Sequence, residues 1–160
     1  WYAPRSTAEA AMVAGIPRAI RFPVTPRARF VTLIPRFEVS TPEARRLVPE
    51  SFSKADTVHC LTRVAVITAA FASGNLEALR GCFDDRIHQP YREPLIPQLS
   101  RVIRAGEQAG AIGGWLSGSG STLICLTLEH PDRVARAMQR ALPDSDLHIL
   151  RADSRGLTRG

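Results

Sequence analysis

The chain has 160 residues, of which 44% are hydrophobic and 22% charged, and its formal net charge is +6. This composition predicts a folded domain and not a disordered chain, and the absence of an apolar run of about 18 residues argues against a membrane helix. The basic residues are nearly all arginines spread along the sequence, so we attribute the charge to a compositional habit and expect no specific nucleic acid partner.

The first predicted elements surround a proline-rich stretch. Residues 8–14 are apolar and fit a short helix, and residues 21–24 fit an edge strand, where proline is tolerated. The β-branched, apolar run over residues 30–34 predicts a central strand.

A short helix and three longer ones should follow. Ser40 or Thr41 can cap the first helix, which has Pro42 in its first turn and ends near Val48. The other helices are expected from Ser53 to Gly74, over residues 76–83 and over residues 99–108; they are placed by apolar residues at helical spacing and by glycine at their ends.

A loop rich in glycine and serine, residues 113–122, precedes an apolar strand over residues 123–128. A helix then runs from Pro131 to residue 142, and a last strand covers residues 147–150. The order strand, helices, strand, strand, helix, strand is typical of an α+β fold. It predicts a ferredoxin-like split βαβ sandwich with extra helices in its first crossover.

Two segments contain residues suited to binding a small anion. Thr41 and Arg45 lie one helical turn apart, so a hydroxyl and a guanidinium could converge there; alternatively, Thr41 only caps the helix and Arg45 is solvated. Prolines stiffen the segment from His88 to Arg92, and Arg92 could bind a carboxylate bidentately; alternatively, the segment is a connector with an exposed arginine.

Other chemistry-bearing residues give weaker signals. The four histidines have no ligand spacing, and the three cysteines form no CxxC pair, so we expect no metal site, no disulfide and a reducing cytoplasm. Asp84 and Asp85 could act as an acid–base pair, but a solvated helix end is the favoured explanation. The sequence identifies no catalytic residue.

Three pieces in this order resemble the C-terminal half of homoserine kinases, which belong to the GHMP kinase superfamily. They are Ser-Thr-Pro-Glu-Ala-Arg from Ser40, His-Gln-Pro-Tyr-Arg-Glu-Pro-Leu-Ile-Pro from His88 and Leu-Ser-Gly-Ser-Gly-Ser-Thr from Leu116. The resemblance implies a GHMP kinase C-terminal domain over residues 30–160, with residues 1–29 as a remnant of a missing half.

The resemblance also implies the chemistry. Homoserine kinases transfer the γ-phosphate of ATP to the hydroxyl of L-homoserine with magnesium, in threonine biosynthesis. The substrate-binding residues would be Thr41, Arg45 and Arg92. The active-site glycine loop would comprise Ser117, Gly118, Ser119 and Gly120; it would brace the phosphate loop and close the site.

The chain departs from the family at two points. Ser121 stands where the family usually has proline, and the phosphate loop of the form Pro-x-x-x-Gly-Leu-Gly-Ser-Ser is absent. We therefore expect the isolated chain to be inactive, to bind no ATP or magnesium by itself, and to associate with its missing half or with a second copy as a homodimer. An alternative is a non-catalytic GHMP-like domain that binds an amino acid or a partner protein.

Overall fold

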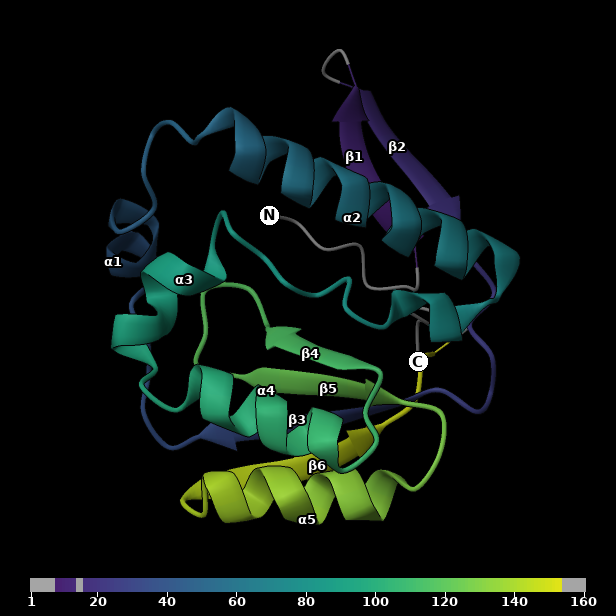
Figure 1. Cartoon of the computed structure of the whole chain (residues 1–160), viewed down its shortest axis with the longest axis vertical. Helices are drawn as coiled ribbons and strands as arrows, with labels where there is room; N and C mark the ends of the chain where they lie inside the picture. Colours follow the sequence, from purple (N-terminus) through teal and green to yellow (C-terminus); the bar gives the residue numbers. More distant parts are fainter. Residues whose placement is uncertain (1–7, 14–15, 154–160) are drawn as a thin grey trace, which may run out of the picture.

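The computed structural model describes residues 8–13 and 16–153. Its central sheet contains four strands, β3 (Arg29–Pro35), β4 (Gly113–Leu116), β5 (Leu123–Thr127) and β6 (Ser145–Leu150). The sheet is antiparallel, with the order β4-β5-β3-β6 (Figure 1). β3 is the central strand that the β-branched run predicted, and its residues Val31 and Leu33 are fully buried.

Two helices, α4 (Leu99–Gln108) and α5 (Pro131–Ala141), cover one face of the sheet. Val102 of α4 and Val134 and Met138 of α5 are fully buried in the cluster between helices and sheet. Burial of each such side chain contributes roughly 1.5–3 kcal/mol. This layer and the strand order confirm the predicted α+β ferredoxin-like split βαβ sandwich.

The opposite face is covered by α2 (Lys54–Ser73) and the 3-10 turn η1 (Leu76–Leu79). Cys125 and Leu126 are neighbours on β5 and belong to the two separate apolar clusters, because successive strand residues point to opposite faces. The predicted ends of α2 are confirmed. The Ser53 Oγ accepts the Asp56 N–H at 3.0 Å, and Gly74 ends the helix with a φ of 75°.

The outward side of α2 is apolar and uncovered. Val58 and Leu61 have exposed fractions of 50% and 63%. By length and composition alone, α2 is long and apolar enough to cross a membrane. The sequence predicts no such helix, because it contains no run of about 18 apolar residues. In this fold, however, the C-terminal part of α2 packs on the sheet through Ala70 and the half-buried Phe71.

The remaining crossover elements are short: α1 (Thr41–Arg46), α3 (Gln89–Arg92) and the 3-10 turn η2 (Glu93–Leu95). The helix predicted over residues 76–83 is wrong beyond Leu79. Gly81 adopts a φ of 73°, a left-handed conformation that cannot continue a helix.

The N-terminal predictions are wrong as well. In place of a helix over residues 8–14, β1 (Ala8–Val13) pairs in antiparallel register with β2 (Ile16–Arg21), and β2 ends where an edge strand was predicted to begin. Pairing with β2 satisfies the backbone N–H and C=O groups of this alanine-rich stretch. The two strands form a sheet of their own, separate from the four-stranded sheet.

Candidate functional site

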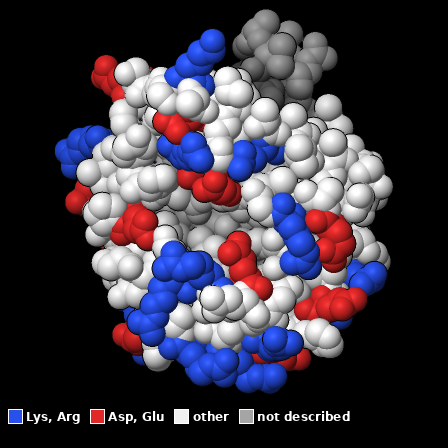
Figure 2. All heavy atoms as spheres, in the orientation of Figure 1, with Lys and Arg blue, Asp and Glu red and all other residues white. Residues whose placement is uncertain are grey.

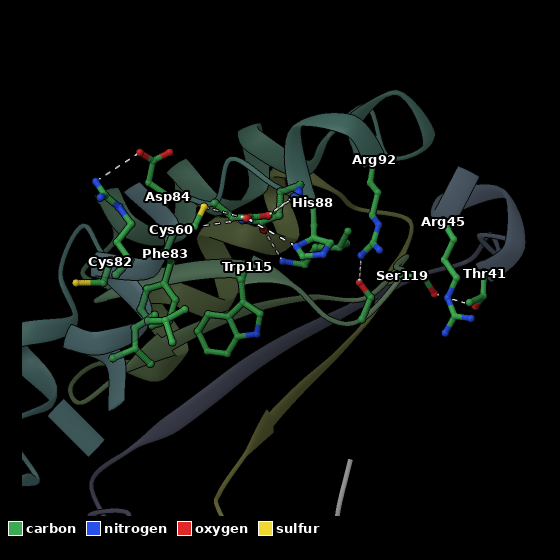
Figure 3. A pocket seen from close by; sticks show the side chains of 17 residues that line it. Thr41, Arg45, Cys60, Cys82, Phe83, Asp84, His88, Arg92, Trp115 and Ser119 are labelled. Atoms are coloured by element: carbon green, nitrogen blue, oxygen red, sulfur yellow. Dashed lines mark hydrogen bonds and ion pairs between the residues drawn. The ribbon is translucent and has the colours of Figure 1, made fainter. Parts of the chain in front are cut away.

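An open pocket of about 530 Å³ lies between α1, α2, α3 and the end of β4 (Figure 3). All three predicted substrate-binding residues line it, together with two residues of the glycine loop: Thr41, Arg45, Arg92, Gly118 and Ser119. The structure thus brings together segments that are distant in the sequence. Ser117 and Gly120 are not among the lining residues, and they shape the turn behind it.

Contact between α1 and the glycine loop is direct. The Thr41 Oγ1 and Ser119 Oγ lie 3.0 Å apart. Ser40 is the residue before the helix but makes no side-chain cap, so the predicted hydroxyl cap is wrong at this end. Thr41 is the first helical residue, and its hydroxyl contacts the loop and not its own backbone.

Arg92 reaches the same loop from α3. Its Nη1 donates to the Gly118 carbonyl at 2.7 Å, while its Nε is buried and has no partner among the described residues. Arg45 forms no ion pair in the described part of the chain. In Figure 3 both guanidiniums lie at one end of the pocket, beside Ser119 and Thr41. This end is positively charged and offers unused donors.

The carboxylate of Asp85 anchors α3. It accepts the backbone N–H groups of Ile87, His88 and Gln89 at 2.9, 2.9 and 2.7 Å. Burial alone would raise the pKa of Asp85, but these three donors and the nearby His88 outweigh burial and hold it below the ordinary value of 3.8. Asp85 is therefore bound to backbone and does not form an acid–base pair with Asp84.

Gln89 ties α3 to β4, a role that the sequence did not reveal. Its Oε1 accepts the Leu116 N–H at 2.7 Å, and its Nε2 donates to the Phe83 carbonyl at 3.3 Å. Leu116 is the last residue before the glycine loop. The one signal in the sequence was that Gln89 lies in the proline-stiffened segment from His88 to Arg92.

The glycine loop is a tight turn. Ser117 N–H donates to the Thr122 carbonyl at 2.9 Å, and Gly118 and Gly120 have φ values of 60° and 102°, which favour glycine. Ser121 is buried, and its hydroxyl donates to the Phe37 carbonyl at 2.7 Å. The loop is thereby joined to the segment that leads into α1.

The other end of the pocket belongs to α2 and the residues after η1. His59 Nε2 lies 3.0 Å from Asp84 Oδ2, and Arg63 Nη2 lies 3.7 Å from the same oxygen. The Arg63 Nε is buried without a partner in the described residues. The rings of Phe83 and Trp115 stack beneath, with centroids 4.7 Å apart.

Metal and thiol chemistry find little support in the described ranges, 8–13 and 16–153. They contain no group of three or more metal-ligating side chains. Cys60, Cys82 and Cys125 are all free thiols. Burial and the nearby Glu107 raise the pKa of the Cys125 thiol to about 12, so this thiol is inert at neutral pH.

Known proteins resemble most of this chain. A family model described as GHMP kinases C terminal matches residues 67–144. A homoserine kinase of Deinococcus radiodurans is 45% identical over 93 residues, which are 58% of this chain and 30% of that protein. One of Caldicellulosiruptor bescii is 36% identical over 145 residues, or 87% of this chain and 47% of that protein.

Solved structures give the same fold. The crystal structure of homoserine kinase from Cytophaga hutchinsonii superposes with a TM-score of 0.83 at 24% identity, covering 88% of this chain and 46% of that one. The L. major mevalonate kinase in complex with R-mevalonate has a TM-score of 0.66 at 14% identity, covering 92% of this chain and 49% of that one. The chain therefore spans less than half the length of each of these relatives.

Proposed function

We propose that this chain, which belongs to the family of GHMP kinase C-terminal domains, is the substrate-binding part of a homoserine kinase. The complete enzyme would transfer the γ-phosphate of ATP to the hydroxyl of L-homoserine, in the cytoplasm and in threonine biosynthesis. The observation that carries the proposal is the convergence of Thr41, Arg45 and Arg92 on one pocket beside the glycine loop.

The charged end of the pocket suits the carboxylate of an amino acid. Arg45 has no carboxylate partner in the described chain. Arg92 donates one hydrogen bond to the Gly118 carbonyl, and its buried Nε has no acceptor among the described residues. A buried donor without an acceptor costs about 1–3 kcal/mol, which a ligand carboxylate would offset. Two guanidiniums and the Thr41 hydroxyl would then orient the substrate so that its distal hydroxyl faces the phosphate donor.

ATP and magnesium would be held mainly by groups that this chain does not carry. No stretch of its 160 residues has the Gly-Leu-Gly-Ser-Ser phosphate loop that the family resemblance implies. Magnesium, when bound, would neutralise charge on the transferring phosphoryl group. The contribution of this chain would be the substrate clamp and the loop of residues 117–120, which would brace the missing phosphate loop.

Two surfaces support the proposal of a missing half. The exposed apolar side of α2 is of the kind that marks an interaction site, and an isolated two-stranded sheet such as β1–β2 is marginally stable in water. The relatives are about twice as long as this chain. We therefore assign these surfaces to the preceding half of the same kind of kinase, with a second copy of this chain as the alternative occupant.

The uncovered α2 and the absent phosphate loop also favour a second candidate function. The chain could act as a non-catalytic GHMP-like domain that binds an amino acid or a partner protein. Loss of the phosphate loop would abolish phosphoryl transfer but leave the clamp intact. One measurement distinguishes the two functions. Adding the preceding half of a homoserine kinase would restore phosphorylation of L-homoserine if this chain is the substrate-binding part of such an enzyme, and would not if it is a non-catalytic domain.

Calorimetric titration with L-homoserine tests the clamp. Arg45→Gln and Arg92→Gln should each weaken binding at least about tenfold, because a charge-assisted bond contributes roughly 1.5–3 kcal/mol. Arg46→Gln is the matched control, since Arg46 lies on the same helix but does not line the pocket. L-homoserine amide, which lacks the carboxylate charge, should bind weakly and equally to all variants.

Two results would contradict the proposal. Equal affinity of the Arg45, Arg46 and Arg92 variants for L-homoserine would show that these guanidiniums do not hold the substrate. Homoserine-dependent ADP release by this chain alone, in a coupled assay, would show that it needs no second half.

A further inference from the structure

A second concave surface lies between α4 and α5, on the side of the sheet opposite α2. It is an open groove of about 540 Å³. Four small residues, two from each helix, lie along it: Ala105, Ala109, Ala137 and Ala141. Four arginines flank them: Arg101, Arg104, Arg133 and Arg140.

Helical spacing explains the shape of this groove. The alanines recur at four-residue intervals on each helix, so they form two facing stripes, and their short side chains leave a hollow. Larger residues such as Val102 and Met138 fill the space beneath, against the sheet. On α5, Arg133 and Arg140 are seven residues apart, which places them about 10 Å apart along one face.

The arginine charges in this groove are compensated only in part, because the carboxylate of Glu107, outside the groove, acts on Arg104 alone among them. No aspartate or glutamate lines it, and none of its four arginines forms an ion pair or side-chain hydrogen bond in the described part of the chain. Some arginines elsewhere in the described chain do form ion pairs, as Arg27 does with Glu129 and Arg80 with Glu77. Figure 2 shows blue atoms gathered over α4 and α5 in the lower part of the molecule.

Four of the arginines that are scattered in the sequence therefore meet on one surface. Like charges on one surface repel one another, although salt screens the repulsion beyond a Debye length of about 8 Å, and an anion bound between them relieves it. The guanidinium fork matches phosphate oxygens in particular. Gln108 adds an uncharged donor to the lining.

We propose that the α4–α5 groove binds an oligophosphate, a ligand with two or more linked phosphate groups. The backbones of Arg133 and Arg140 lie about 10 Å apart along α5, so a short phosphate chain can contact more of the four arginines at once than a single phosphate can. The groove contains no aromatic side chain, so it has no platform on which nucleic acid bases could stack. The phosphate chain, free or attached to a nucleoside, is the part that the groove recognises.

Titration calorimetry with inorganic tripolyphosphate tests this site. Arg104→Gln and Arg140→Gln should each weaken binding about tenfold, and raising the salt from about 50 to 200 mM should weaken it further. Arg136→Gln is the matched control. Arg136 is an exposed arginine of α5 that does not line the groove, so its removal should change the affinity less than twofold.

Three further arms decide what the groove recognises. Arg45→Gln should leave tripolyphosphate binding unchanged, because Arg45 belongs to the other pocket. ATP without magnesium should bind within about threefold of tripolyphosphate, since the same phosphate chain is recognised. Circular dichroism of each variant should match the parent, because exposed substitutions on helices change the free energy of unfolding by only about 0.5 kcal/mol.

The proposal is overturned if the parent chain does not bind tripolyphosphate at low salt. It is also overturned if Arg136→Gln and Arg140→Gln weaken tripolyphosphate binding equally. Binding of a single-stranded oligonucleotide without binding of tripolyphosphate would also overturn it, as would binding of ATP alone. None of these results depends on homoserine binding.

Discussion

Thr41 and Ser119 are 78 positions apart in the sequence, and their hydroxyl oxygens lie 3.0 Å apart. This hydrogen bond joins the start of α1 to the glycine loop. Thr41→Val keeps the shape of the side chain but removes the bond. We expect Thr41→Val to lower the free energy of unfolding by only about 0.5 kcal/mol, because the bond is exposed. The affinity for L-homoserine, measured by calorimetry, should fall severalfold.

Thr62→Val is the control for this change. Thr62 is an exposed threonine of α2 whose hydroxyl bonds only to backbone carbonyls of its own helix. It should leave homoserine affinity unchanged. Equal affinity of the Thr41 and Thr62 variants would show that the contact with Ser119 is irrelevant to the site.

Asp85 should stabilise the fold in a pH-dependent way. Its pKa is lowered in the folded state, so its stabilisation is present above the ordinary value of 3.8 and is lost as the pH falls through the folded-state value. Asp85→Asn should cost about 1–2 kcal/mol at pH 7 by urea unfolding, because the charged acceptor of three N–H groups is lost.

The difference between parent and Asp85→Asn should shrink toward pH 3. Asp84→Asn is the matched control, because the more exposed Asp84 side chain pairs with His59 and Arg63 and makes no bond to α3. Asp85→Asn should also weaken homoserine binding through the displaced Arg92. A difference that stays constant with pH would contradict the assigned role of the carboxylate.

Gly120→Ala should be more destabilising than Gly110→Ala. Both glycines have left-handed φ values, 102° and 111°, so alanine strains the backbone at either position by about 1–3 kcal/mol. At Gly120 the new Cβ would also lie 2.5 Å from Ile96 Cδ1, whereas at Gly110 nothing lies within 4 Å.

We expect this crowding at Gly120 to lower the free energy of unfolding by about a further 1–3 kcal/mol. Thermal unfolding of the two variants measures the difference. Equal melting temperatures would mean that the fully buried Ile96 can move aside freely.

The outward face of α2 should drive association of the isolated chain. Light scattering should find dimers or larger species, and Leu61→Gln, at a position 63% exposed, should shift them toward monomers without changing stability by more than about 0.5 kcal/mol. Leu150→Gln removes a comparable exposed leucine on β6 and should leave association unchanged. A monomeric parent chain would contradict this expectation.

The sequence predicted those parts of the fold that depend on local signals. Ser53 and Gly74 mark the ends of α2 through their own backbone conformations, and the apolar run over residues 30–34 predicts a central strand whatever surrounds it. The β1–β2 pairing was missed because alanine favours a helix locally and the partner strand overrides that preference.

The site was predicted only in part for a related reason. Thr41, Arg45 and Arg92 belong to recognisable pieces, and they do line one pocket. Asp85 and Gln89 act through backbone groups brought near by folding, so no spacing reveals them. The groove arginines lie on two helices whose packing is a property of the sandwich and not of either helix alone.

One helix, α2, contributes to two surfaces at once. Its inner side supplies Cys60, Arg63 and Ile67 to the wall of the pocket, while its outer side presents Leu61 to whatever docks there. Docking on the outside would restrain the wall on the inside, and a ligand that restrains the wall would favour docking by the same factor. If the proposed preceding half docks on this face, we expect the proposed amino-acid ligand to tighten that association.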